Sequence, residues 1–161
     1  LGTSLPMSNV TFYLLDETND TLQQPAHFAL ACLLATRSYR QKQKCLVYCQ
    51  DQKQAEQFDE LLWQLPNDAF VPHNLSGEGP VGGAPVEICW QTPSQFNRPI
   101  LINLADTTPD FHQRFRQVID FVPAKEQLKP QARERYKQYR AAGNQLDTLP
   151  ASSINETQNN G

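Results

Sequence analysis

An alternation of strand-like and helix-like segments in the N-terminal part of the chain constrains the fold more than any other sequence feature. Residues 10–15 are rich in strand-forming side chains, and residues 45–49 form a second short apolar run. Between these runs, apolar residues recur at helical spacing after Pro25, and Asp51 with Gln54 resembles a capping box that opens another helix. Strand, helix, strand and helix in this order predict a right-handed β-α-β unit, and hence an α/β domain with a largely parallel sheet.

Further strands and one more helix extend this pattern. Three apolar runs are interpreted as strands: residues 86–90, 100–104 and 116–122. A helical turn from Pro109 is an alternative for the residues just before the last of them. Periodic apolar positions predict a helix over residues 124–143, with Gly143 as its stop. Residues 70–85 contain four glycines and three prolines, so we expect no regular structure there.

The predicted fold is a single three-layer α/β/α domain with a mostly parallel, mixed sheet, Rossmann-like but without a nucleotide-binding loop. We expect this domain to cover residues 7–146. Residues 1–6 precede Met7 and are typical of an expression-tag remnant. Residues 147–161 are polar and nearly uncharged, which predicts a disordered tail. Because the sequence has neither a secretion signal nor an apolar run of about 18 residues, we expect a cytoplasmic protein.

The cysteines and histidines do not have the spacing of a metal site. Each cysteine lies within an apolar segment, which predicts reduced thiols in the core. These residues are Cys32, Cys45, Cys49 and Cys89. No close Cys-x-x-Cys pair is present, and the three histidines show no ligand spacing. We therefore expect neither a metal ion nor a cofactor.

Nucleotide chemistry is disfavoured at the place where an α/β sheet would provide it. Ligands of such sheets bind beyond the carboxyl ends of the strands. After the first strand, residues 16–20 are acidic instead of glycine-rich, so they repel phosphate. The glycine-rich residues 76–83 contain Glu78 and lack a Lys-Ser/Thr pair, which indicates a structural loop. We expect no intrinsic catalysis, and a nucleotide-dependent enzyme is the weakest alternative.

The charge distribution indicates one anion-seeking surface. Residues 125–140 carry six basic and two acidic side chains, a local charge of +4 in a chain whose net charge is −3. Lys129, Arg133 and Lys137 recur every four residues and share one helix face. Tyr136 and Tyr139 interleave with them. The alternatives are a solvated basic face, a site for an acidic peptide with a hydrophobic anchor, and a site where tyrosines stack on single-stranded nucleic acid.

A second candidate surface lies in residues 63–73. This segment combines large apolar side chains with two prolines: Trp63, Leu65, Phe70 and Val71. Such residues either plug the sheet or anchor a protein interface, and the sequence leaves both interpretations open.

Several segments of the chain resemble the chi-subunit family of bacterial DNA polymerase III. The resemblance covers residues 10–144 and is most specific in the glycine-containing block. The segments are residues 11–16 (TFYLLD), 59–63 (DELLW), 70–88 (FVPHNLSGEGPVGGAPVEI), 120–123 (DFVP) and 132–140 (ARERYKQYR).

The resemblance implies an accessory subunit that pairs one-to-one with the psi subunit. Through psi it joins the clamp-loader complex, and it holds the acidic, phenylalanine-ending tail of single-stranded DNA-binding protein. Some family members use the same surface for a repair helicase. The tail site implied for this chain consists of Val122, Pro123, Lys129, Arg133, Tyr136 and Lys137. The implied psi contacts are Trp63, Phe70, Val71, Pro72 and His73.

Pro130 departs from an uninterrupted helix between Lys129 and Arg133. A proline inside a helix removes an amide donor, whereas in the first turn it removes nothing that the helix uses. We therefore expect the helix to begin just before Pro130.

Overall fold

One parallel sheet organises the protein. The structure is a computed structural model that describes residues 8–15, 26–64 and 70–154. The described strands form a 7-stranded sheet in the order β3-β4-β2-β5-β6-β1-β7. The strands are β1 (Asn9–Leu14), β2 (Cys45–Tyr48), β3 (His73–Leu75), β4 (Val86–Cys89), β5 (Ile100–Asn103), β6 (Gln117–Val122) and β7 (Gln145–Pro150). The α/β class is confirmed, and the pairings among these strands are all parallel.

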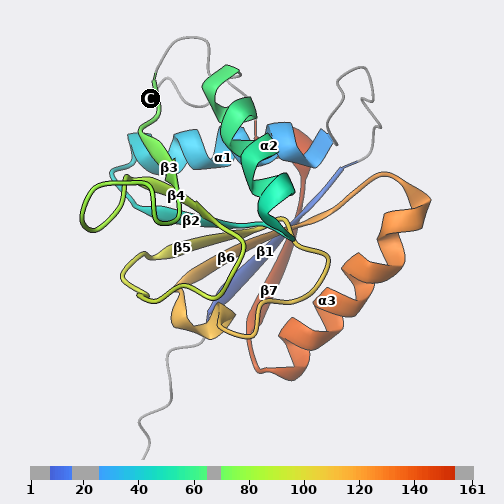
Figure 1. Cartoon of the computed structure of the whole chain (residues 1–161). Coiled ribbons are helices and arrows are strands. Elements are labelled where there is room, and N and C mark those ends of the chain that lie inside the picture. Colours follow the sequence, from blue (N-terminus) through green and yellow to red (C-terminus); the bar gives the residue numbers. More distant parts are fainter. Residues whose placement is uncertain (1–7, 16–25, 65–69, 155–161) are drawn as a thin grey trace, which may run out of the picture.

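Helices cover both faces of the sheet and make the predicted three layers (Figure 1). Helices α1 (Ala26–Arg40) and α2 (Gln52–Gln64) lie on one face, and α3 (Lys129–Ala141) lies on the other. Short 3-10 turns occur at η1 (His112–Arg114), η2 (Glu126–Leu128) and η3 (Ala151–Ser153). The turn η1 corresponds to the helical turn that the sequence offers after Pro109.

Side chains alternate between the two faces along each strand. In β6, Ile119 and Phe121 belong to the core under α1 and α2, whereas Val118 belongs to the core under α3. In β1, Tyr13 faces the α1 side and Phe12 faces the α3 side. Because both faces are covered, most side chains of the central strands are apolar, and these strands appear as apolar runs in the sequence.

The start of α2 agrees with the predicted cap. Asp51 Oδ1 accepts a hydrogen bond from the Gln54 amide at 2.8 Å, which satisfies one of the free amides of the first turn. The side chain of Gln54 turns back, as in a capping box, but it accepts from the Gln50 amide at 2.6 Å instead of from Asp51. The predicted inward residues Ala55, Phe58 and Leu62 are buried.

The sequence-based prediction was wrong for two strands at the sheet edges. Residues 70–85 were expected to lack regular structure, but β3 lies within them and pairs with β4. Residues 147–161 were expected to be a disordered tail, but β7 pairs with β1 from Asn9↔Gln145 to Leu14↔Pro150. Edge strands are held by backbone hydrogen bonds and need few apolar side chains, so composition does not reveal them. Residues 1–6 and 155–161 lie outside the described residues.

The four cysteines are free and buried, as predicted. Burial raises the pKa of Cys45 to about 12, although the charge of Arg98 opposes this. Burial also raises the pKa of Cys89 to about 12. At neutral pH these thiols stay protonated, and a protonated thiol is a poor nucleophile and metal ligand.

Candidate functional site

Helix α3 begins at Lys129, with Pro130 in its first turn. A proline is tolerated there because the amide it lacks has no acceptor within the helix. The sequence predicts a helix from residue 124, but residues 124–128 are not α-helical. The turn η2 leads from the end of β6 into α3 instead. The expected start just before Pro130 is confirmed, and Pro130 interrupts no hydrogen bond between the turns that carry Lys129 and Arg133.

The basic surface of α3 consists of Arg133, Lys137 and Arg140, which are exposed. Lys129 is partly buried, and its Nζ donates a hydrogen bond to Glu126 Oε1 at 2.8 Å. This hydrogen bond and the charge of Lys129 lower the pKa of Glu126. An acidic ligand at Lys129 must therefore compete with Glu126, whereas Arg133 and Lys137 extend into solvent.

The two tyrosines of α3 do not both lie at the surface. Tyr139 is completely buried, and its hydroxyl donates to Asp120 Oδ2 at 2.7 Å. Tyr136 is partly buried, with its ring centroid 5.4 Å from that of Phe12 in β1. The prediction that both tyrosines interleave with exposed cations is therefore wrong for Tyr139. Tyr136 alone of the pair offers an aromatic edge next to the basic surface.

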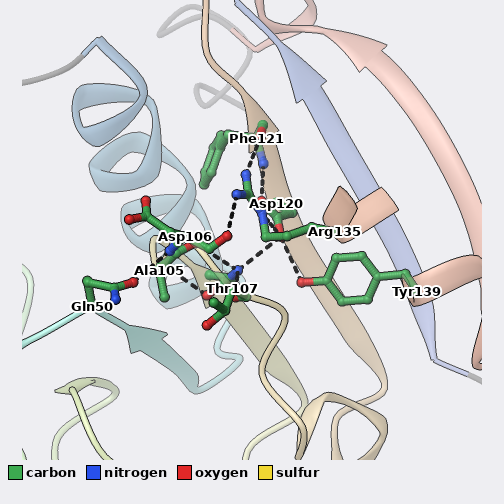
Figure 2. Close-up of polar contacts among 9 residues, drawn as sticks. Gln50, Ala105, Asp106, Thr107, Asp120, Phe121, Arg135 and Tyr139 are labelled. Atoms are coloured by element: carbon green, nitrogen blue, oxygen red, sulfur yellow. Dashed lines mark hydrogen bonds and ion pairs between the residues drawn. The ribbon is translucent and has the colours of Figure 1, made fainter. Parts of the chain in front are cut away.

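A buried polar network fixes α3 to the sheet (Figure 2). Arg135 Nε donates to both carboxylate oxygens of Asp120 at 3.2 Å. The Nη2 of Arg135 donates to the Phe121 carbonyl at 3.0 Å, and its Nη1 donates to the Asp106 carbonyl at 2.9 Å. Asn103 Nδ2 adds a hydrogen bond to Asp120 Oδ2 at 3.0 Å. One carboxylate in the middle of the sheet thus gathers donors from β5, β6 and α3.

Burial dominates the electrostatics of this network. Desolvation raises the pKa of Asp120, while the positive charge of Arg135 and the surrounding donors oppose this rise. Burial and the neighbouring carboxylate raise the pKa of Tyr139 well above its usual value, so its hydroxyl remains a donor. Arg135 and Asp120 are 6% and 1% exposed, so neither charge has a solvent alternative to its partner.

Removing the guanidinium of Arg135 should lower the stability of the folded protein. We expect Arg135→Leu to lower the free energy of unfolding by about 3–5 kcal/mol, because it leaves the buried Asp120 carboxylate without its cation. Arg133→Leu is the matched control, since Arg133 is exposed on the same helix and should change stability by less than about 0.5 kcal/mol. Urea unfolding checks both values. Equal stability of the two variants would contradict the structural role of the network.

The predicted tail-site residues lie on two sides of β6. Val122 is partly buried and packs against the α3-side core, as does Tyr136. Its register neighbour in β1 is Leu14, which is 41% exposed. Pro123, the next residue, is buried and lines a separate cavity. The structure therefore associates Val122, Arg133, Tyr136 and Lys137 with the α3 side and separates Pro123 from them.

The cavity lined by Pro123 lies beyond the carboxyl ends of β5 and β6. Its volume is about 170 Å³. The walls include polar and apolar side chains, namely His27, Phe28, Gln54, Asn103, Leu104, Ala105, Asp106, Asp120, Phe121, Pro123, Leu128, Gln131 and Arg135. The His27 ring lies 5.0 Å from the Phe28 ring and 5.8 Å from the Phe121 ring. Burial, followed by the charge of Arg135, lowers the pKa of His27 to about 4.

This lowered pKa makes stability depend on pH. The unfolded chain protonates His27 near pH 6.5, whereas the folded protein keeps it neutral down to about pH 4. The full stability is therefore present above pH 6.5 and is lost as the pH falls toward 4. Because His27 is only partly buried, we expect its contribution to this loss to be about 2 kcal/mol. Urea unfolding at several pH values checks this, with His27→Gln as the variant that should lose less stability across the same range.

The second candidate surface, which we call the aromatic surface, consists of Trp63, Phe70 and His73. Trp63 and Phe70 are 57% and 61% exposed, and their ring centroids are 5.1 Å apart. The ring of His73 lies 4.7 Å from that of Trp63. His73 Nε2 lies 3.3 Å from Asp59 Oδ1, so the imidazole is held against α2. His73, which is held by Asp59, thus packs against the exposed ring of Trp63 and limits its movement.

Not every predicted psi contact displays its side chain. Val71 is 2% exposed and belongs to the core under α1 and α2. Pro72 is partly buried next to it. Both alternatives for this segment are therefore realised: Val71 plugs the sheet, while Trp63 and Phe70 point to solvent.

The glycine-rich loop before β4 is held by side chains from other segments. Arg98 Nη2 donates to the Gly82 carbonyl at 3.2 Å, and the Ala84 amide donates to Asn74 Oδ1 at 2.7 Å. A Cβ on Gly83 would collide with Arg98 and Glu87, and Gly83 has a positive φ of +78°. These contacts favour the predicted structural role of the loop over a phosphate cradle.

Within residues 8–15, 26–64 and 70–154, no group of three or more His, Cys, Asp or Glu side chains could hold a metal ion. None of the helices in those same ranges has the length and apolar character needed to cross a membrane.

Sequence reasoning missed two features of this region, the burial of Arg135 and the exposure of Leu14. It counted Arg135 among the basic residues of the helix, because charge alone does not distinguish a buried cation from an exposed one. It also missed Leu14, although Val10, Phe12 and Leu14 alternate at strand spacing in the sequence. That alternation is the signal that could have put Leu14 on the same face as Phe12.

The fold and its surfaces define a parallel α/β protein with a basic helix and an aromatic surface. The sequence profile of a family described as "DNA polymerase III chi subunit, HolC" matches residues 7–147. The chain is 50% identical over 143 residues to the DNA polymerase III subunit chi of Escherichia coli, covering 88% of this chain and 97% of that protein.

Two further relatives carry the same description. The chain is 46% identical over 138 residues to the Haemophilus influenzae protein, covering 85% of this chain and 93% of that protein. It is 31% identical over 137 residues to the Pseudomonas aeruginosa protein, covering 85% and 92%. The chain belongs to the DNA polymerase III chi subunit family, as the segments identified in the sequence suggested.

Proposed function

We propose that the chain is a non-catalytic accessory subunit of DNA polymerase III that works in DNA replication in the cytoplasm. In this role it bridges the clamp-loader complex, through a one-to-one pairing with psi, to the acidic C-terminal tail of single-stranded DNA-binding protein. Membership of the chi family supports the accessory role. The positions of the two surfaces support the bridging role.

The separation of the two surfaces is the observation that carries this proposal. The aromatic surface lies at α2 and β3, and β3 is one outer strand of the sheet. The basic surface lies on α3, which leads directly into β7, the opposite outer strand. Six inter-strand spacings of about 4.8 Å separate these strands by roughly 29 Å. The two surfaces therefore lie toward opposite edges of the sheet, which leaves room for two partners.

The basic surface suits an acidic peptide. Arg133, Lys137 and Arg140 expose their cationic side chains to solvent, and guanidinium groups pair well with carboxylates. Tyr136 and Val122 add partly buried apolar contact beside these charges. The combination matches a peptide with several carboxylates and a hydrophobic end.

The aromatic surface suits a protein subunit. Exposed tryptophan and phenylalanine side chains are typical anchors of protein interfaces because burying them removes a large apolar area from water. The contact between Trp63 and Phe70 and the bracing by His73 reduce the conformational entropy lost on binding. We assign this surface to psi, with Trp63 and Phe70 as the anchors and Pro72 at their margin.

Direct binding of single-stranded nucleic acid is the less favoured alternative. That function needs several aromatic faces for base stacking beside the cations. With Tyr139 buried, Tyr136 is the one tyrosine of α3 that reaches the basic surface. The net charge of −3 also disfavours a nucleic-acid surface.

We expect Arg133→Glu to weaken binding of an acidic, phenylalanine-ended peptide by about tenfold to a hundredfold, because it puts a repelling charge at the centre of the basic surface. Isothermal titration calorimetry measures this, and the affinity of the unchanged protein should fall as salt rises.

Arg40→Glu is the matched control for this charge reversal. Arg40 is exposed in the last turn of α1, on the other face of the sheet, so peptide binding should persist. Unchanged binding in Arg133→Glu would remove the basic surface as the tail site. Tight oligonucleotide binding by the isolated chain would favour the nucleic-acid alternative instead.

The psi assignment predicts a separate loss of function. We expect Trp63→Ala to weaken psi binding by at least about thirtyfold, as typical for a central aromatic anchor, while peptide binding stays unchanged. Arg133→Glu should have the reverse pattern. Calorimetry with purified psi and with the peptide gives both readouts, and loss of both in one variant would contradict two independent surfaces.

A further inference from the structure

Three segments without acidic residues meet at the amino edge of the sheet. These segments are residues 26–50, 88–105 and 111–119, and none of them contains Asp or Glu. They include the starts of β2, β5 and β6, which are parallel neighbours in the sheet. Because parallel strands begin at the same edge, the side chains that precede these strands gather there.

Four exposed cations lie at this edge, and we call them the amino-edge surface: Lys42, Lys44, Arg114 and Arg116. Lys44 precedes β2 and Arg116 precedes β6, with β5 in register between them. Two inter-strand spacings of about 4.8 Å separate β2 from β6 by roughly 10 Å. Among the residues that the structure describes, none of the four cations forms an ion pair. Their charges are therefore available to a ligand.

An aromatic ring holds one of these cations in place. The Cζ atom of Arg114 lies 4.3 Å from the centroid of the Phe96 ring. Phe96 in turn packs against the rings of Phe111 and Phe115, at centroid distances of 5.9 and 6.0 Å. A guanidinium over a ring keeps its N–H donors directed outward in its own plane, where an anion can accept from them. Arg114 is thus positioned before a ligand binds, which lowers the entropy cost of binding.

A polar cavity of about 260 Å³ lies at the same edge. Its walls carry hydroxyl and amide side chains, among them Asn74, Ser76, Ser94, Gln95 and Asn97. Arg98 also lines it, but this guanidinium is buried and pairs with Glu87 at 3.5 Å. Neutral hydroxyls and amides both donate and accept hydrogen bonds, as sugars and nucleobases require.

The net charge of −3 conceals this surface, because exposed acids lie at the opposite ends of the same strands. Asp51 follows β2, and Asp106 follows β5. Strands of four residues separate the two edges by about 13 Å. This exceeds the screening length of about 8–10 Å, so the acids do not cancel the cations. The protein is therefore polarised along its strands, with the positive end at the amino edge.

We propose that the amino-edge surface binds the phosphate backbone of single-stranded DNA, with an unpaired nucleotide reaching the polar cavity. A uniformly charged strand suits this surface better than an acidic peptide with an apolar anchor, because the described aromatic ring beside the cations already lies under Arg114. The contact is independent of base sequence. It uses a different edge from α3 and needs no tyrosine stacking.

This contact is weak by itself. Four phosphate contacts give an affinity that falls steeply as salt rises. A partner held at the tail site would bring its bound strand close and so raise the effective concentration of DNA at this surface. This last step alone rests on the proposed function.

The test measures binding of a fluorescent oligothymidylate to the purified chain by anisotropy at several salt concentrations. The logarithm of the binding constant should fall with the logarithm of salt with a slope of about −3, from about −0.7 for each of four neutralised phosphates. We expect Lys44→Gln and Arg116→Gln each to weaken binding at low salt by about threefold to tenfold. Each should also reduce the magnitude of the slope by about 0.7.

Lys53→Gln is the matched control. Lys53 is exposed in the first turn of α2, beyond the carboxyl end of β2, so the same charge change should leave affinity and slope unaltered. Equal losses in this control and in Lys44→Gln, or an unaltered slope in both edge variants, would overturn the proposal. Thermal unfolding of each variant checks that the fold is intact.

Two competitors identify the ligand and the site. A polyglutamate peptide at the same charge concentration should displace the oligonucleotide poorly, and full displacement would make this a surface for acidic proteins instead. The acidic, phenylalanine-ended peptide should leave the oligonucleotide bound, whereas displacement would transfer the DNA site to α3 and overturn this inference. Failure of the proposed function is a separate result, namely that the unchanged protein binds neither psi nor that peptide.

Discussion

The buried pair of Asp120 and Arg135 is the interaction on which the arrangement of the surfaces depends. It ties one residue of α3 to the middle of the sheet, so it sets the rotation of the helix about its axis. With Arg135 turned inward, Arg133 and Lys137 must turn outward and Tyr136 must meet β1. A buried ion pair contributes little net stability compared with apolar packing, but it tolerates few alternative arrangements. Here we infer that it specifies which face of α3 is available to a ligand.

The central elements were predictable because both faces of the sheet are covered. Buried parallel strands and the helices packed on them leave strong apolar signals, and β1, α1, β2 and α2 follow them closely. It was harder to predict which side chains of the charged helix are buried. Arg133 and Arg135 are the same residue type in the same helix. Arg135 is the buried one because it pairs with Asp120, an acid on a strand fifteen residues earlier in the chain. Tyr139 was misjudged for the same reason, since its partner is also Asp120.

The edges of the sheet were not predictable from composition. β7 is mostly exposed, so nothing in its side chains separates it from a polar tail. What makes it a strand is its backbone register with β1, a pairing between residues more than 130 positions apart. The candidate site inherits this difficulty. Its helical part is visible as a charge surplus, whereas the contact of Tyr136 with Phe12 depends on the position of β1 in the sheet.

The place of β1 in the sheet makes one edge of the sheet depend on completion of the chain. β1 is the first strand to be synthesised, yet its neighbours β6 and β7 are the last two. Domains are produced from the N-terminus onward, and pairings between distant segments form late. A nascent chain can assemble the α2 and β3 end early, whereas the edge of the sheet beside β1 requires the final strand. A prematurely ended product without β7 would thus carry the aromatic surface but would lack the outer strand that pairs with β1.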